Sequence, residues 1–147
     1  MAQQKTPQTI ETVPTNYILC LKGDCPKAAM CLRHKATLMM QAEVQTWSIL
    51  SPAYLAQIEG ECPYYRSAEK VQYARGFARM MSALTVTQAH MVKDCIVAKF
   101  GMNMYYRMRR GERLITPTEQ DELYQLLEQQ GVKTRPEFDA YVEDYLW

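Results

Sequence analysis

Apolar residues recur at helical spacing through the second half of this chain. From Ser67, which can cap the start, one apolar stripe predicts a first helix through Val71, Ala74, Ala78 and Met81. A second helix is predicted from Thr87 to Gly101, and its inward face would consist of Val92, Cys95, Ile96 and Phe100. A short segment from Asn103 to Gly111 follows.

The clearest helix start is the capping box Thr116–Glu119, which places Pro117 at the first helical position. The helix predicted there runs to Gly131 over a buried stripe of Leu123, Leu126 and Leu127. A last helix is predicted from apolar residues spaced i, i+3, i+4 and i+7, namely Phe138, Tyr141, Val142 and Tyr145.

The first half of the chain has a different pattern. Tyr17–Leu21 and Val44–Leu50 are rich in β-branched and aromatic residues and predict two short strands. Between them, Asp24 and Pro26 predict the start of a helix that continues to Met40.

These patterns predict a mainly α protein with a small two-stranded β element beside its cysteines. We expect three regions: a disordered polar leader over residues 1–15, a cysteine-rich lobe over 16–66 and a helical domain over 67–147. No apolar run reaches the about eighteen residues that a membrane span needs, and the leader lacks the apolar core of a signal peptide. A cytoplasmic protein without membrane association is therefore expected.

Four of the five cysteines are placed as metal ligands would be. Cys20, Cys25 and Cys31 fall in the segment YILCLKGDCPKAAMCLRH, and Cys62 follows in ECPYYR. Thiols stay reduced in the cytosol, and an odd cysteine count argues against a closed set of disulfides. We therefore predict a metal centre formed by these four thiols, whereas Cys95 is interpreted as a core residue of its helix.

The identity of the metal stays open between zinc and an iron–sulfur cluster, and the alternative is that the four thiols bind no metal and are small buried apolar residues. Zinc usually uses tight C-x2-C pairs, whereas the gaps here are four and five residues, which suit the wider ligand spacing of a cluster. The spacing Cys25-x5-Cys31-x2-His34 resembles the end of the ligand run in cluster-sensing bacterial repressors, and His34 is a reserve ligand. No HExxH or HxE motif accompanies the thiols and His90 has no partner as a general base, so no enzyme activity is expected.

Charge is distributed unevenly along the chain. The net charge is +1 overall, but residues 91–117 hold six basic against two acidic side chains and residues 118–147 hold two basic against eight acidic ones. A basic centre indicates a surface for an anionic partner. Alternatively, the basic and acidic segments pair with each other on the surface, or the aromatic and acidic C-terminal helices bind a protein.

Residues 87–111 are similar to the helix-turn-helix segment of repressor-type proteins. In VAKFGMNMYYRMRRGE, Ala98 and Gly101 take the packing and turn positions, although the gap between them is one residue short. The resemblance implies that the second helix enters the major groove of double-stranded DNA. Its predicted contacts are Tyr105, Tyr106, Arg107, Arg109 and Arg110, with backbone contacts from Lys93, Lys99 and Arg113.

Four segments, CPKAAMCLRH, ECPYYR, YYRMRRGER and FDAYVEDY, together resemble a family of small uncharacterised cysteine-cluster proteins from anaerobic gut bacteria. That family has no established activity to transfer. The leading hypothesis from the sequence is a small metal-containing DNA-binding transcriptional regulator. The alternative is a metal-stabilised protein–protein interaction module that does not bind DNA.

Overall fold

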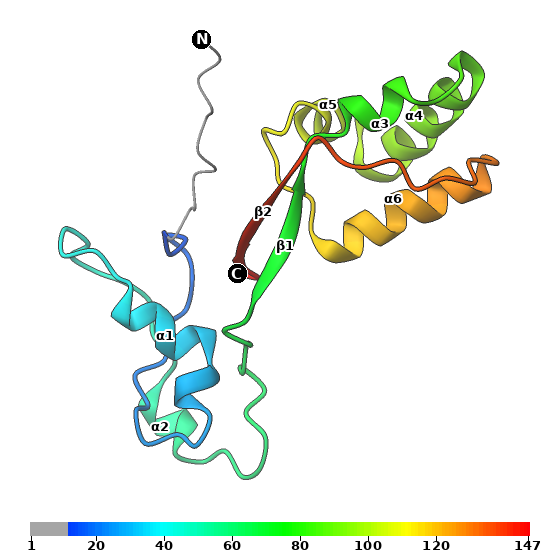
Figure 1. Cartoon of the computed structure of the whole chain (residues 1–147). Coiled ribbons are helices and arrows are strands. Elements are labelled where there is room, and N and C mark those ends of the chain that lie inside the picture. Colours follow the sequence, from blue (N-terminus) through cyan, green and yellow to red (C-terminus); the bar gives the residue numbers. More distant parts are fainter. Residues whose placement is uncertain (1–11) are drawn as a thin grey trace. The chain divides into compact units, whose positions relative to one another are not determined.

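A computed structural model describes residues 12–147 (Figure 1). Within this range the chain is mostly helical and contains a two-stranded antiparallel sheet. Apart from one 3-10 turn, Ala28–Met30, its helices are α1 Leu32–Leu38, α2 Pro52–Leu55, α3 Ala78–Ser82, α4 Val86–Phe100, α5 Met102–Arg109 and α6 Pro117–Gln129. The strands are β1 Lys70–Arg75 and β2 Ala140–Tyr145. Most of the predicted leader, residues 1–11, lies outside the described residues.

The chain divides into two compact units. The N-terminal unit comprises the residues up to Val71 together with Asp144–Trp147, and the helical unit comprises Gln72–Glu143. The boundary therefore falls inside both strands, and the last four residues belong to the N-terminal unit. No helix among the described residues has both the length and the apolar character needed to cross a bilayer.

The helical unit has an extensive apolar core. A cluster of thirteen buried residues reaches from Ala74 to Phe138 and includes Phe77, Tyr105 and Met108, none of which is more than 1% exposed. The rings of Phe77 and Tyr105 meet edge to face with centroids 5.6 Å apart. Burial of this many large side chains gives the unit a core that can stabilise it independently.

Helix starts and stops in this unit are the best predicted features. The Thr116–Glu119 capping box is present, with Pro117 in the first turn of α6. Helix α4 also begins with a capping box, but its N-cap is Thr85. Its first residue is Val86, one residue before the predicted start at Thr87. Gly101 ends α4 as predicted, and Val92, Ile96, Leu123 and Leu127 are buried.

Two of the predicted helices are wrong. The first, from Ser67, is replaced by β1 and the short α3, and the last one is strand β2. Both segments are rich in Val and Tyr, and their burial alternates in part, as in Val142 and Asp144 inward against Tyr141 and Glu143 outward. An i, i+3, i+4 pattern fits such short segments by coincidence, and pairing between residues about seventy positions apart selects the extended form.

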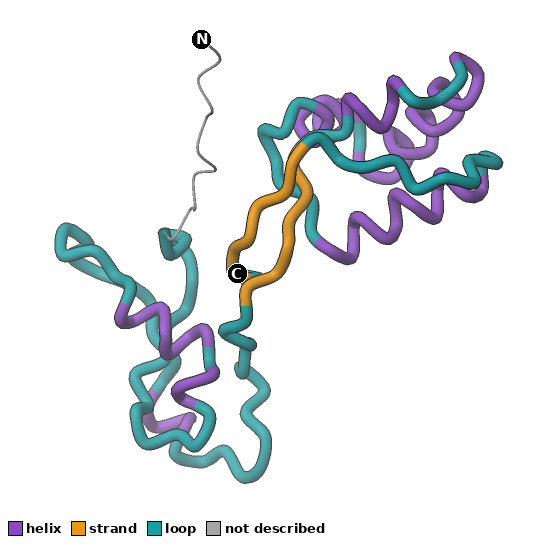
Figure 2. The backbone as a smooth tube through the Cα atoms, viewed as in Figure 1, coloured by secondary structure: helices purple, strands orange, loops and turns teal. Residues whose placement is uncertain are grey.

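The β element predicted beside the cysteines is also wrong in its location. Tyr17–Leu21 and Val44–Leu50 contribute one parallel bridge, between Leu19 and Ile49, and no named strand. The helix predicted from Asp24 begins instead at Leu32, after the 3-10 turn. Figure 2 shows loops along most of the backbone before β1.

Candidate functional site

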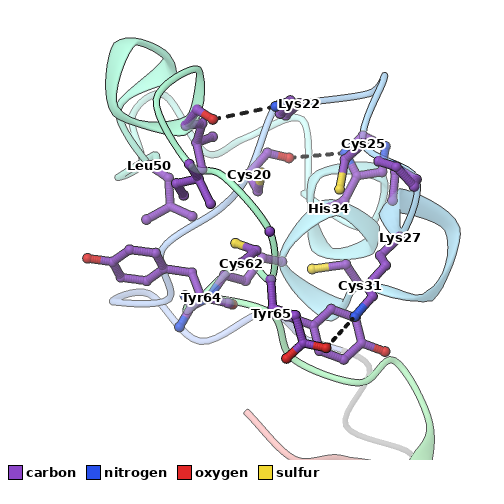
Figure 3. A pocket seen from close by; sticks show the side chains of 17 residues that line it. Cys20, Lys22, Cys25, Lys27, Cys31, His34, Leu50, Cys62, Tyr64 and Tyr65 are labelled. Carbon is purple, nitrogen blue, oxygen red and sulfur yellow. Dashed lines mark hydrogen bonds and ion pairs between the residues drawn. The ribbon is translucent and has the colours of Figure 1, made fainter.

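The four predicted thiol ligands line one cavity of about 370 Å³ in the N-terminal unit, together with His34 (Figure 3). Cys20 and Cys25 belong to the loop before the 3-10 turn, and Cys31 lies directly before α1. Cys62 lies in the loop that follows α2. Three segments of backbone thus bring their thiols to the same space.

Backbone hydrogen bonds fix the chain at Cys20 and Cys31. The amide of Cys20 donates to the carbonyl of Arg33 (3.1 Å), and the Cys31 carbonyl accepts the amide of Lys35 (2.9 Å) at the start of α1. Next to Cys31, the Leu32 amide donates to the Arg66 carbonyl at 2.7 Å. The segment that follows Cys62 is therefore fixed against the start of α1.

Arg33 crosslinks the segments that carry Cys20 and Cys62. Its Nε donates to the Tyr64 carbonyl and its Nη1 to the Ile18 carbonyl, both at 2.8 Å. The guanidinium also lies over the Tyr17 ring, 5.0 Å from its centroid. Each carbonyl is two residues from a cysteine, so one side chain sets the spacing of the two thiol-bearing segments. Sequence reasoning missed this role, since Arg33 has no signal beyond lying between Cys31 and His34.

The thiols differ in their exposure to solvent. Cys20 and Cys31 are both 9% exposed, whereas Cys25 and Cys62 are half-buried. All the cysteines are free thiols. The site therefore has a more buried pair of thiols, Cys20 and Cys31, and a more exposed pair, Cys25 and Cys62.

His34 is oriented as a metal-binding histidine would be. Its Nδ1 lies 3.1 Å from the Cys20 carbonyl, and because a carbonyl oxygen only accepts, Nδ1 carries the proton. In the neutral ring Nε2 then has a free lone pair, which is the form that binds a metal. The structure thus places the predicted reserve ligand at the same cavity as the thiols.

Cationic side chains surround the cavity and outnumber the acidic ones. Lys22, Lys27 and Arg33 line it, against Glu61 alone. Lys22 donates to the Leu55 carbonyl (3.4 Å), and the Lys27 ammonium lies 3.9 Å from Glu61 and 5.0 Å from the Tyr65 ring centroid. A centre of four thiolates carries excess negative charge even with a metal bound, and these cations offset it.

No three His, Cys, Asp or Glu side chains among the described residues are arranged to hold one metal ion. The thiols thus surround a space without converging on one point. Cys95 belongs to the helical unit, where it is half-buried and its Sγ lies 3.7 Å from Gln130 Nε2.

The predicted DNA-contacting residues divide into three groups. Tyr105 is 1% exposed and packs in the core of the helical unit, so it has almost no surface to offer DNA. Tyr106 is half-buried, and its hydroxyl accepts a hydrogen bond from Lys93 Nζ at 3.3 Å.

A second group is paired with carboxylates of the same unit: Lys99–Glu122 at 2.9 Å, Arg110–Glu112 at 2.6 Å and Arg113–Glu119 at 2.7 Å. Burial alone would raise the pKa of Glu119, but the hydrogen bonds from Arg113 and Thr116 outweigh it and hold the pKa below its ordinary value. Arg113 is therefore part of the α6 capping structure.

The third group is Lys93, Arg107 and Arg109. Within residues 12–147 none of these three forms an ion pair with a carboxylate. Arg107 is exposed and Arg109 is half-buried. Of the eight predicted contacts, these three basic residues are therefore the ones with charge still available to a partner.

Comparison with known proteins gives a family and no activity. Neither the search of curated proteins nor the search of solved structures found a match to this chain. A family model described as a family of unknown function, DUF6078, matches residues 1–147. The chain belongs to this family.

Proposed function

We propose that the N-terminal unit contains a metal centre formed by its cysteine thiolates. We further propose that the protein is a metal-stabilised protein–protein interaction module. The observation that supports the centre most strongly is the position of Cys20, Cys25, Cys31 and Cys62 around one cavity. Thiolates are the ligands that zinc and iron–sulfur clusters share. His34 and the surrounding cations add a reserve donor and charge compensation.

The small core of the N-terminal unit gives a reason for a metal. Its described apolar cluster contains Cys20, Leu50 and Leu55, with Ile58 packed against it, and Leu19, Leu32 and Ala36 are buried as well. Many large apolar side chains of the same unit remain exposed, including Ile18, Leu21, Met30, Leu38, Val44, Trp47 and Ile49. Small domains with too little buried apolar surface commonly depend on disulfides or metals, and the cysteines here are free.

We favour an iron–sulfur cluster over a single zinc ion at this site. Zinc holds its sulfurs at about 2.3 Å, which requires the ligands to converge on a point. No three His, Cys, Asp or Glu side chains in the described part of the chain are arranged to hold a single ion. A cluster occupies more space and takes its four ligands at separate corners.

Anaerobic purification tests the centre directly. We expect a brown protein with visible absorption, and iron and acid-labile sulfide in matching amounts. Cys31→Ser should lose the metal, whereas Cys95→Ser, in the helical unit, should retain it. Stoichiometric zinc in a colourless protein would replace the cluster by a zinc centre. A protein that binds neither metal would contradict the proposal.

The helical unit provides the interaction surface in this proposal. Of the basic residues predicted to contact DNA, Lys99, Arg110 and Arg113 pair with carboxylates of the same unit, and the predicted contact Tyr105 is in the core. These contacts favour the interaction module over the DNA-binding regulator. They leave Lys93, Arg107 and Arg109 for an anionic partner.

DNA binding is the second candidate, and the exposed, unpaired Arg107 on α5 is the observation that favours it. Duplex retention that weakens as salt rises is expected if these arginines contact phosphates. The combined change of Arg107, Arg109 and Arg110 to glutamine should then abolish retention, whereas Lys133→Gln, on an exposed loop, should not. Unchanged retention in the triple variant would exclude this surface as a DNA site.

A further inference from the structure

A second cavity lies wholly within the helical unit. It is a shallow open groove of about 330 Å³ between α3 and the first turns of α4, and α5 also contributes to its lining. Its apolar lining comes from Ala78, Met81, Leu84, Val86, Ala89 and Tyr105. Met81 and Tyr105 are core residues, and Leu84 and Ala89 pack against the core. The groove is therefore formed in the folded unit without any partner.

Val86 is an exposed apolar residue at the edge of the groove. It is the first residue of α4 and its side chain is 77% exposed. An apolar side chain beside a preformed apolar groove loses contact with water when a partner docks, which favours binding. The shallow, open shape suits an extended contact with a protein segment better than the enclosure of a small molecule.

The charges at the groove select the kind of segment. His90, Lys93 and Arg109 line it, and no acidic residue does. Lys93 and Arg109 form no ion pair with a carboxylate in the described part of the chain. Asp139, which caps α3, has both carboxylate oxygens occupied by the amides of Ala78 and Arg79, at 2.9 and 2.7 Å.

We propose that this groove binds an acidic, amphipathic peptide segment of a partner protein. Apolar side chains of the segment lie on Met81, Leu84 and Val86, and its carboxylates pair with Lys93 and Arg109. DNA fits less well because a phosphate backbone offers nothing to fill the apolar floor. The inference rests on the interaction role proposed above but not on a metal, so metal analysis and peptide binding can fail separately.

The chain offers a matched pair of variants for the test. Val86 and Met102 are each the first residue of a helix, α4 and α5, and both are exposed, but only Val86 lines the groove. Glutamate is favourable in a first helical turn, so Val86→Glu and Met102→Glu should both fold. The full chain is used to select binders from random peptides displayed on phage, and the selected peptides are then titrated against each variant.

We expect the selected peptides to combine carboxylates with large apolar residues. Val86→Glu should weaken their binding at least about tenfold, which corresponds to about 1.4 kcal/mol. Met102→Glu should leave it unchanged. Lys93→Met with Arg109→Gln should weaken binding and reduce its dependence on salt.

Four results would overturn the inference. Selected peptides that lack acidic residues, or that bind the Val86→Glu protein equally well, exclude the groove as their site. Peptides displaced by duplex DNA would assign the surface to nucleic acid. Self-association that Val86→Glu abolishes would make a second copy of this chain the occupant.

Discussion

Removing the proposed metal, or replacing Cys31 by serine, should unfold the N-terminal unit and leave the helical unit folded. The helical unit has a thirteen-residue apolar cluster. The N-terminal unit buries fewer apolar residues in the described part of the chain, and two of them are proposed metal ligands; the buried residues are Leu19, Cys20, Cys31, Leu32, Ala36, Leu50, Leu55 and Tyr145. For scale, structural zinc binds zinc-finger peptides with an apparent free energy of about 10–16 kcal/mol at about pH 7, and that binding free energy is folding free energy. The N-terminal unit is therefore expected to depend on the metal far more than the helical unit does.

Hydrogen exchange followed by mass spectrometry separates the two units. Amides of Cys20, Leu32 and Leu50 are bonded to other segments of the N-terminal unit and should lose protection when a chelator or Cys31→Ser removes the metal. Amides of Ala74 and Ile115, which pair with each other in the helical unit, should keep theirs. Cys95→Ser serves as the matched thiol control.

Two outcomes would contradict this expectation. Protection of the Leu32 amide that survives metal removal would show that contacts such as Arg33 with Ile18 and Tyr64 suffice to hold the unit. Equal loss of protection in both units would show that the whole chain unfolds cooperatively, which the division of its contacts into two units does not predict.

Arg33 shows why the candidate site was only partly predictable. The thiols were identified because cysteine is rare and its chemistry is narrow, so their clustering in sequence is informative. The cavity depends on backbone contacts such as Leu32 with Arg66 and on the Arg33 guanidinium, whose partners are carbonyl groups. Any residue supplies a carbonyl, so side-chain identity carries no signal for these contacts.

The fold was predictable where its signals were local. The Thr116 capping box fixes a helix start through contacts three residues apart, and it was predicted correctly. Strands β1 and β2 are paired across about seventy residues, and their short Val- and Tyr-containing segments fit both periods. Tyr105 was misassigned to a DNA contact for a related reason: its ring is amphipathic, and only the packing against Phe77 decides which way it faces.

Gly76→Ala should destabilise the helical unit by about 2–4 kcal/mol, combining backbone strain with loss of a helix cap. Gly76 has φ +76°, and an added Cβ would lie 2.6 Å from Asp139 Oδ2 and 3.3 Å from the Arg109 carbonyl oxygen. The Asp139 carboxylate cannot move away freely, because it accepts the amides of Ala78 and Arg79 at the start of α3. Its own amide also donates to the Gly76 carbonyl at 3.0 Å.

Gly131 provides the matched control, since its φ is +78° and nothing lies within 4 Å of an added Cβ. Gly131→Ala should therefore cost about 1–2 kcal/mol, the strain alone. Denaturant unfolding followed by far-ultraviolet circular dichroism measures both, because α4, α5 and α6 supply most of the helix. The double variant Gly76→Ala with Asp139→Ala should be destabilised by less than the sum of the two single variants, because the carboxylate that collides with the added Cβ is gone. Equal costs for the two glycine variants, or strict additivity with Asp139→Ala, would show that the Asp139 cap does not constrain this turn.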